Sequence, residues 1–215
     1  MYVAVKGTAG GDGVGVVCRN GDCTFQIDAL STNFVAAGCA SYCGIFWMNR
    51  FTPDPADYPI TITSISTIFA ASSGWNAPGD HINVYVYQDN NTTPLDGATF
   101  VASSLGYTIS APSDDFTTIT LPTPIVVDGP GDVLIALTNP GPNLGTHPAS
   151  ADAGPFAGRS WVTSYDDNGL PPELGGIGLV PNPVAIPGFV GNWLIRAAGT
   201  NAGGQPIVLG MPTRE

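Results

Sequence analysis

Residues that could carry out catalysis are scarce in this sequence. Its two histidines, His81 and His147, are the available general bases, and no Gly-x-Ser-x-Gly motif accompanies them. Most of the 17 acidic residues are Asp in turns, where the carboxylate usually bonds to its own backbone. Glycoside hydrolysis instead requires two carboxylates that face each other across a cleft. We therefore predict no catalytic residues and a protein that is not an enzyme.

One turn has the composition of a calcium loop. Asp166, Asp167 and Asn168 place hard oxygen ligands next to Gly169, as calcium loops do. The full spacing of an EF-hand is missing, and a solvated turn explains the same residues. Calcium is the one cofactor that the sequence suggests, and these three residues are its candidate ligands.

Aromatic residues outside the predicted core are candidates for sugar binding, because a flat ring stacks on the face of a pyranose. Trp47 and Trp193 lie in apolar segments and are assigned to the core. The other candidates could equally serve as packing residues; they are Trp75, Tyr85, Tyr87 and Trp161.

Two overlapping glycosylation sequons occur in the run Asn90-Asn91-Thr92-Thr93, with Asn90 and Asn91 as acceptors. They fall in a polar turn after a predicted strand, where an acceptor would be exposed. Because the motif often arises by chance, modification at both positions is a hypothesis.

The four cysteines all lie in the first fifth of the chain. Asn20-Gly21 is a strong signal for a type I′ hairpin turn. This turn places Arg19 opposite Asp22, and on the next rung it places Cys18 opposite Cys23, close enough to bridge.

We therefore predict the disulfides Cys18–Cys23 and Cys39–Cys43, and with them an extracellular or cell-surface location. Free thiols and a zinc site are the alternatives. Zinc is less favoured because structural zinc sites usually use a Cys-x2-Cys step, whereas the gaps here are longer.

The charge balance excludes two classes of partner. The formal net charge is -11, and Lys6 is the single lysine. Neutralising phosphates needs clustered cations, so the sequence argues against nucleic-acid binding and against adsorption to an anionic membrane. It also contains no apolar run of the roughly 18 residues that a membrane span needs.

The elements that would position these residues are strands. With 28 Gly and 20 Pro, the chain is rich in turn residues and lacks helical periodicity. Residues 82–87 alternate so that Ile82, Val84 and Val86 face a core, and residues 132–137 are apolar on both faces, as a central strand is. Further candidate strands are 44–51, 60–69 with a bulge near Ser64, 100–109, 116–121, 124–127, 158–164 and 191–198.

Many short strands without crossover helices predict an all-β protein, an antiparallel β-sandwich of jelly-roll or Greek-key type. We predict one buried core that contains Val84, Ile135, Trp193 and Ile195. The chain divides into a Gly-rich N-terminal segment (1–43) with the hairpin and disulfides, a sandwich (44–199) and a C-terminal tail (200–215).

Both predicted tails carry short apolar segments beside glycines. Such a segment could pair with its own sheet, or it could add as a strand to the sheet edge of a neighbouring copy. The residues predicted to make this contact are Tyr2, Val3, Val5, Ile207, Val208 and Leu209.

Several segments resemble a known type of module. They are Asn49-Arg50-Phe51-Thr52-Pro53, Gly79-Asp80, Val84-Tyr85-Val86-Tyr87, Leu121-Pro122-Thr123-Pro124, Gly129-Pro130-Gly131-Asp132, Pro148-Ala149-Ser150, Gly158-Arg159-Ser160-Trp161 and Gly191-Asn192-Trp193. Together they resemble uncharacterised jelly-roll-like β-sandwich modules of large secreted bacterial proteins, over about residues 49–197. The resemblance implies a β-sandwich and supplies no catalytic residues.

Two functions fit these observations. The first is an extracellular structural protein that assembles with copies of itself into a surface filament, sheath or layer. The alternative is a carbohydrate-binding or adhesive module with glycans as partners and calcium as a candidate cofactor.

Overall fold

The structure is a computed structural model. It describes residues 2–8, 17–19, 22–24, 33–39, 44–71, 76–91, 93–140, 146, 148–152, 156–181 and 191–207. Before residue 44 it describes only the backbone of the strands. No helix in these residues is long and apolar enough to cross a membrane.

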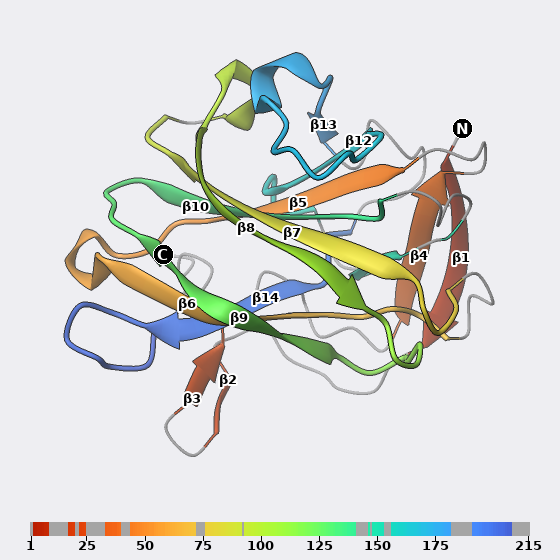
Figure 1. The fold of residues 1–215 in the computed structure, drawn as a ribbon, viewed down its shortest axis with the longest axis horizontal. Helices are drawn as coiled ribbons and strands as arrows, with labels where there is room; N and C mark the ends of the chain where they lie inside the picture. Colours follow the sequence, from red (N-terminus) through yellow and green to blue (C-terminus); the bar gives the residue numbers. More distant parts are fainter. Residues whose placement is uncertain are drawn as a thin grey trace.

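Two antiparallel sheets pack face to face (Figure 1). In spatial order, the six-stranded sheet contains β13 (Val180–Pro181), β12 (Ser160–Ser164), β5 (Ile45–Phe51), β10 (Asp132–Thr138), β7 (His81–Asp89) and β8 (Thr99–Thr108). The five-stranded sheet contains β2 (Val17–Arg19), β3 (Asp22–Thr24), β14 (Ile195–Thr200), β6 (Ile60–Thr67) and β9 (Thr117–Val127). The prediction of an antiparallel β-sandwich is confirmed.

A smaller sheet stands beside one end of the sandwich (Figure 1). Its three strands are β1 (Tyr2–Thr8), β4 (Asn33–Cys39) and β11 (Ala149–Asp152), and its pairings are antiparallel. Three single-turn 3-10 helices lie in the connections: η1 (Pro55–Asp57), η2 (Pro94–Asp96) and η3 (Leu174–Gly176).

The core between the two large sheets contains the residues that the sequence predicts. Val84, Ile135, Trp193 and Ile195 are each 0% exposed and belong to one cluster. They come from β7, β10, β14 and the segment just before β14, so residues far apart in sequence meet in this core.

Local strand predictions also hold in detail. Every residue of β10 is buried, as expected for a strand that lies between β5 and β7. The pairing of β6 with β9 shifts register between Ile62 and Ser64, where the sequence predicts a bulge.

The N-terminal hairpin forms with the predicted register. β2 pairs with β3 so that Arg19 is opposite Asp22 and Cys18 is opposite Cys23. The disulfides are side-chain features outside the described part of the chain, and they stay predictions. The three-part division of the chain also stays a prediction, although β3 pairs with β14 and β4 pairs with β11.

The outer face of the six-stranded sheet is covered as well, which the sequence patterns do not predict. Residues 165–179 run over this face, and Leu174 and Leu179 pack there against Phe46, Tyr85 and Leu134. The covering segment therefore creates a second apolar cluster, separate from the core between the sheets.

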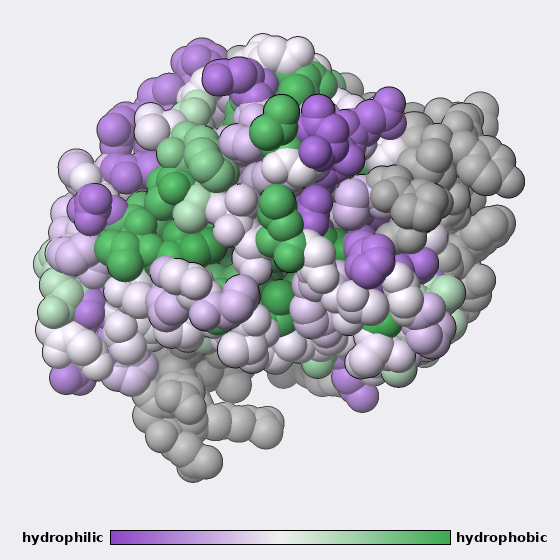
Figure 2. Space-filling model, in the orientation of Figure 1, coloured by the Kyte–Doolittle hydropathy of each residue, from purple (hydrophilic) through white to green (hydrophobic). Residues whose placement is uncertain are grey.

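Some apolar side chains remain exposed on the face that β8 crosses. Figure 2 shows them gathered there between polar side chains. Phe100 and Leu105 belong to β8, and Leu170 belongs to the covering segment. None of these three residues lines the pocket described below.

Candidate functional site

A cluster of charged side chains occupies one end of the outer face of the six-stranded sheet. Asp89 ends β7 and Asp132 begins β10, and the two are directly opposite each other. Arg50, on the neighbouring strand β5, is opposite Leu134 of β10. Because side chains two residues apart point to the same face of a sheet, the strand pairing brings all three charged groups to this face.

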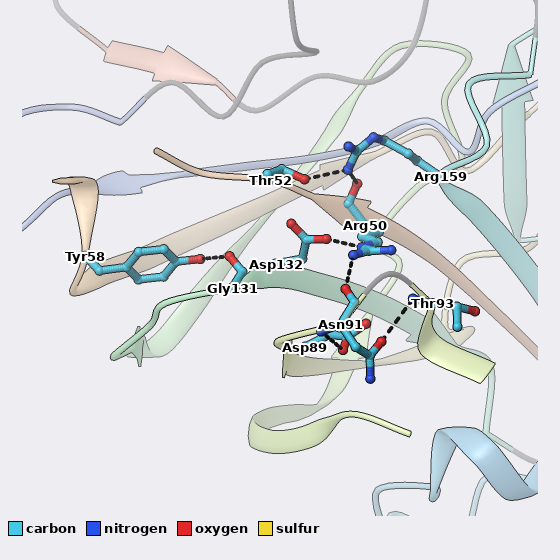
Figure 3. Close-up of polar contacts among 9 residues, drawn as sticks. All are labelled: Arg50, Thr52, Tyr58, Asp89, Asn91, Thr93, Gly131, Asp132 and Arg159. Carbon is cyan, nitrogen blue, oxygen red and sulfur yellow. Dashed lines mark hydrogen bonds and ion pairs between the residues drawn. The ribbon is translucent and has the colours of Figure 1, made fainter. Parts of the chain in front are cut away.

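Arg50 holds the cluster together (Figure 3). Its Nε atom pairs with Oδ2 of Asp132, and its Nη2 atom donates to the backbone carbonyl of Asn91. The guanidinium thereby links β5, the start of β10 and the turn after β7.

Asp89 is buried, and the described residues use only part of its hydrogen-bonding capacity. Its Oδ1 atom accepts the backbone N–H of Asn91 at 3.0 Å, but its Oδ2 atom has no partner among the described residues. Asp89 is 2% exposed. Burial raises its pKa, with Asp132 and Asp96 adding to the effect, and the Asn91 hydrogen bond and Arg50 oppose it.

Arg159 lies beside Arg50, and the described residues engage one of its side-chain nitrogens. Its Nη1 atom donates to Oγ1 of Thr52 at 2.7 Å and to the Arg50 carbonyl at 3.5 Å. In the described part of the chain, no acceptor meets Nε or Nη2 of Arg159, and no carboxylate pairs with it. Its side chain is half-buried, and burial lowers its pKa, as does Arg50, while Asp132 raises it.

These groups line a pocket of about 570 Å³. Its lining includes Gly131, whose φ of +122° belongs to a region that favours glycine. A β-carbon at this position would lie 2.3 Å from Oδ1 of Asn90 and 2.5 Å from the carbonyl oxygen of Asp89. The remaining lining residues are polar or small, without an aromatic ring: Arg50, Thr52, Asn91, Asp132, Ala157, Gly158 and Arg159.

A buried polar network fixes the strands beneath the pocket. Asn49 donates from Nδ2 to the carbonyl of Trp193 at 2.8 Å and accepts from the hydroxyl of Ser160 at 2.6 Å. The same hydroxyl accepts the N–H of Trp193. Asn49 directly precedes Arg50 in the sequence, and Ser160 directly follows Arg159. The network therefore fixes the backbone positions from which the two arginine side chains extend.

The candidate calcium ligands lie at the other end of the same sheet face. Asp166 and Asn168 are exposed. Asp167 points to the sheet and accepts four hydrogen bonds, from Nδ2 of Asn83 (2.9 Å), the hydroxyl of Tyr85 (2.8 Å), Oγ1 of Thr138 and the N–H of Gly169 (2.7 Å). No group of three or more metal-binding side chains occurs in the residues that the structure describes. Calcium binding stays a prediction, and Asp167 is engaged by protein donors.

The predicted aromatic platform is wrong for the three of its residues that the structure describes. Tyr85, Tyr87 and Trp161 are 0%, 1% and 6% exposed. Tyr85 and Tyr87 do lie on the face of β7 opposite to Val84, but residues 165–179 cover that face. The hydroxyl of Tyr87 even donates to the carbonyl of Pro172, within the cover. Trp75 lies outside the described residues.

Asn90 and Asn91 are exposed in the turn after β7, as the glycosylation hypothesis requires. Oδ1 of Asn91 accepts the N–H of Thr93 at 3.0 Å. Modification of either residue stays a prediction. Of the two histidines, His81 begins β7 and its Nδ1 atom is 3.2 Å from Oγ1 of Thr108, and His147 lies outside the described residues.

The described parts of the segments predicted to contact neighbouring copies make contacts within their own chain. The strand that contains Tyr2, Val3 and Val5 pairs along its length with β4. Ile207 is 1% exposed in the main core, and its N–H donates to the carbonyl of Gly199. Val208 and Leu209 lie outside the described residues.

Arg50, Arg159 and Asp89 were not predicted as site residues from the sequence. A signal was available, because Asn49-Arg50-Phe51-Thr52, Gly131-Asp132 and Gly158-Arg159-Ser160 all belong to the segments that carry the family resemblance. Only the strand pairing brings these segments to one end of a sheet.

Comparison with known proteins supports the fold and leaves the activity open. No family model and no curated protein matches the sequence. A similar solved structure is that of the cysteine protease and lectin-like domains of Cwp84, a surface layer associated protein of Clostridium difficile. The two structures share 12% sequence identity with a TM-score of 0.50, and the match covers 86% of this chain and 37% of that one.

Proposed function

We propose that this protein is a non-enzymatic binding module of the cell surface or extracellular space, and that it holds a saccharide in the pocket around Arg50, Asp89 and Arg159. The observation that carries the proposal is the pocket itself. It is lined by planar polar side chains, and two of them retain hydrogen-bonding atoms that no described residue satisfies.

Unsatisfied buried polar groups are rare in folded proteins, and the Oδ2 atom of Asp89 is one that calls for an explanation. A saccharide offers one, because each hydroxyl both donates and accepts hydrogen bonds. The Asp89 carboxylate could accept from such a hydroxyl, and Nε and Nη2 of Arg159 could donate to another oxygen. A volume of about 570 Å³ falls within the roughly 300–1,000 Å³ typical of small-molecule sites.

The likeness to Cwp84 supports this proposal by analogy. That structure comprises cysteine protease and lectin-like domains of a surface layer associated protein. At 12% identity the likeness is one of fold, so the choice of a saccharide depends on the pocket chemistry together with that analogy.

Self-assembly by strand addition is the less supported candidate. It needs a free donor segment, yet β1 pairs with β4 and Ile207 packs in its own core. What still favours it is β8, a ten-residue strand at the edge of the six-stranded sheet, with Phe100 and Leu105 exposed. Light scattering at increasing protein concentration would detect the polymers that this hypothesis requires.

A glycan array with neutral and acidic saccharides tests the proposed function. We expect selective binding that Asn90→Leu weakens at least tenfold, because this exposed residue lines the pocket. Asn168→Leu is the matched control, an exposed asparagine in the Asp167 turn at the other end of the sheet face. Binding to no saccharide, or equal loss in both variants, would contradict the proposal.

A further inference from the structure

Given the proposed saccharide site, we infer that the pocket selects an acidic saccharide, whose carboxylate binds the Nε–Nη2 edge of Arg159 while a neighbouring sugar hydroxyl donates to Asp89. This inference depends on the proposed function and adds the chemical class of the ligand.

The pocket lacks the feature that binds neutral sugars by stacking. None of its lining residues is aromatic, and the nearby rings of Tyr85, Tyr87 and Trp161 are buried. Recognition here must come from hydrogen bonds and charge. Hydrogen bonds between charged partners are roughly twice as strong as those between neutral ones, so a ligand with a carboxylate gains more from this pocket than a neutral sugar.

Arg159 has the geometry to take a carboxylate. One edge of its guanidinium is fixed by Thr52 and by the Arg50 carbonyl, which holds the plane in place. The other edge, formed by Nε and Nη2, meets no described acceptor. A guanidinium edge with two parallel N–H groups matches the two oxygens of a carboxylate.

The other charges of the site favour Arg159 over Arg50 as the anchor. Arg50 is paired with Asp132, so its charge is largely compensated within the protein. Arg159 has no carboxylate partner in the described chain, although the protein has a net charge of -11. The same net charge disfavours a densely charged polyanion, so a saccharide with a single carboxylate fits best.

Asp89 supplies the second half of the recognition. Asp89 lines the same pocket, its side chain is 2% exposed, and its buried Oδ2 atom has no partner among the described residues. A carboxylate oxygen there accepts a hydroxyl and repels a second anion. The pocket thus offers N–H donors for a carboxylate and an acceptor for a hydroxyl. A sugar acid carries both a carboxylate and hydroxyls.

The test uses three saccharides that each carry one carboxylate, together with their methyl esters. The probes are cellobiouronic acid, glucuronic acid linked to galactose, and 3′-sialyllactose. Esterification removes the charge and keeps the ring, so wild-type protein alone can give the answer by titration calorimetry. We expect at least one acid to bind tenfold or more tightly than its own ester.

Variants then locate the effect. Arg159→Gln should abolish the preference for acid over ester, and Arg159→Lys should restore part of it because it keeps the charge without the forked edge. Arg196→Gln is the matched control, since Arg196 stacks on Phe116 away from the pocket.

The outcomes separate the two proposals. Equal binding of acids and esters, or a preference that survives Arg159→Gln, overturns the acidic ligand and leaves saccharide binding intact. Failure of every acid and ester, together with a blank glycan array, overturns both proposals.

Discussion

Two aspartates lie at opposite ends of the same sheet face, and they differ in how many hydrogen bonds their carboxylates accept. Asp167 accepts hydrogen bonds from Asn83, Tyr85, Thr138 and Gly169, so both of its oxygens have partners. Asp89 accepts one hydrogen bond through Oδ1, and its Oδ2 atom has no described partner.

The difference separates a structural carboxylate from one that is available for binding. Asp167 fastens the covering segment to β7 and β10, because its partners come from both. Asp89 instead faces a pocket next to Arg159, and burial raises its pKa. Titratable groups in a pocket whose pKa is shifted are candidates for a functional site. Residues selected for function often reduce the stability of the fold.

Removing the Asp167 carboxylate, both of whose oxygens accept hydrogen bonds, should give the largest loss of stability. Asp167→Ala leaves the donors of Asn83, Tyr85 and Thr138 without their acceptor, and leaving buried donors unsatisfied should cost about 2–3 kcal/mol in the free energy of unfolding. Urea denaturation measures this cost. Asp166→Ala, at the exposed neighbour, should unfold like the wild type, and equal losses in both variants would refute the assigned role.

Substituting Gly131, which lines the pocket, should have an intermediate effect. Gly131→Ala forces a β-carbon to within 2.3 Å of Asn90 and 2.5 Å of the Asp89 carbonyl, so we expect a loss of about 1–3 kcal/mol and weaker saccharide binding. Gly79→Ala is the control, because Gly79 also has a positive φ (+98°) but no atom within 4 Å of the place that a β-carbon would take. If both variants lose the same stability, the close approach at Gly131 is not important.

Neutralising the Asp89 carboxylate should raise the stability of the protein slightly. The pKa of Asp89 is raised in the folded protein, so the folded state favours the protonated form, and ionisation weakens folding as the pH increases. Asp89→Asn should therefore unfold like the wild type below pH 3.8, the ordinary pKa of the group, and gain stability relative to it at neutral pH. Single stabilising substitutions commonly gain about 0.5–2 kcal/mol.

Thermal melts across this pH range measure the effect, and saccharide binding is measured in parallel. Asp89→Asn should bind less tightly while it melts at a higher temperature. A variant that is less stable than the wild type at neutral pH would show that Asp89 is a structural residue like Asp167.

Local patterns made much of the fold predictable. The alternation of residues 82–87 identified β7, the apolar run 132–137 identified the central strand β10, and Asn20-Gly21 identified the register of the β2–β3 hairpin. Each of these depends on neighbours in the sequence, and hydrophobic periodicity reports such relations.

The site could not be predicted because it depends on contacts between distant segments. Arg50, Asp132 and Arg159 meet only through the pairing of β5 with β10 and β12. Tyr85 and Tyr87 have the pattern of exposed aromatics on an alternating strand, and only the cover formed by residues 165–179 buries them. Strand alternation distinguishes the two faces of a sheet, but it does not reveal that both are covered.

An NMR titration tests the contrast between the two ends of the sheet face most directly. Cellobiouronic acid, glucuronic acid linked to galactose, 3′-sialyllactose and their methyl esters would each be added to labelled protein. We expect saccharide binding to shift the amide signals of Asn91, Gly131 and Gly158, which line the pocket, while those of Asn83, Thr138 and Gly169 stay in place. Shifts gathered around Asp167, or no shift with any of the six compounds, would contradict it.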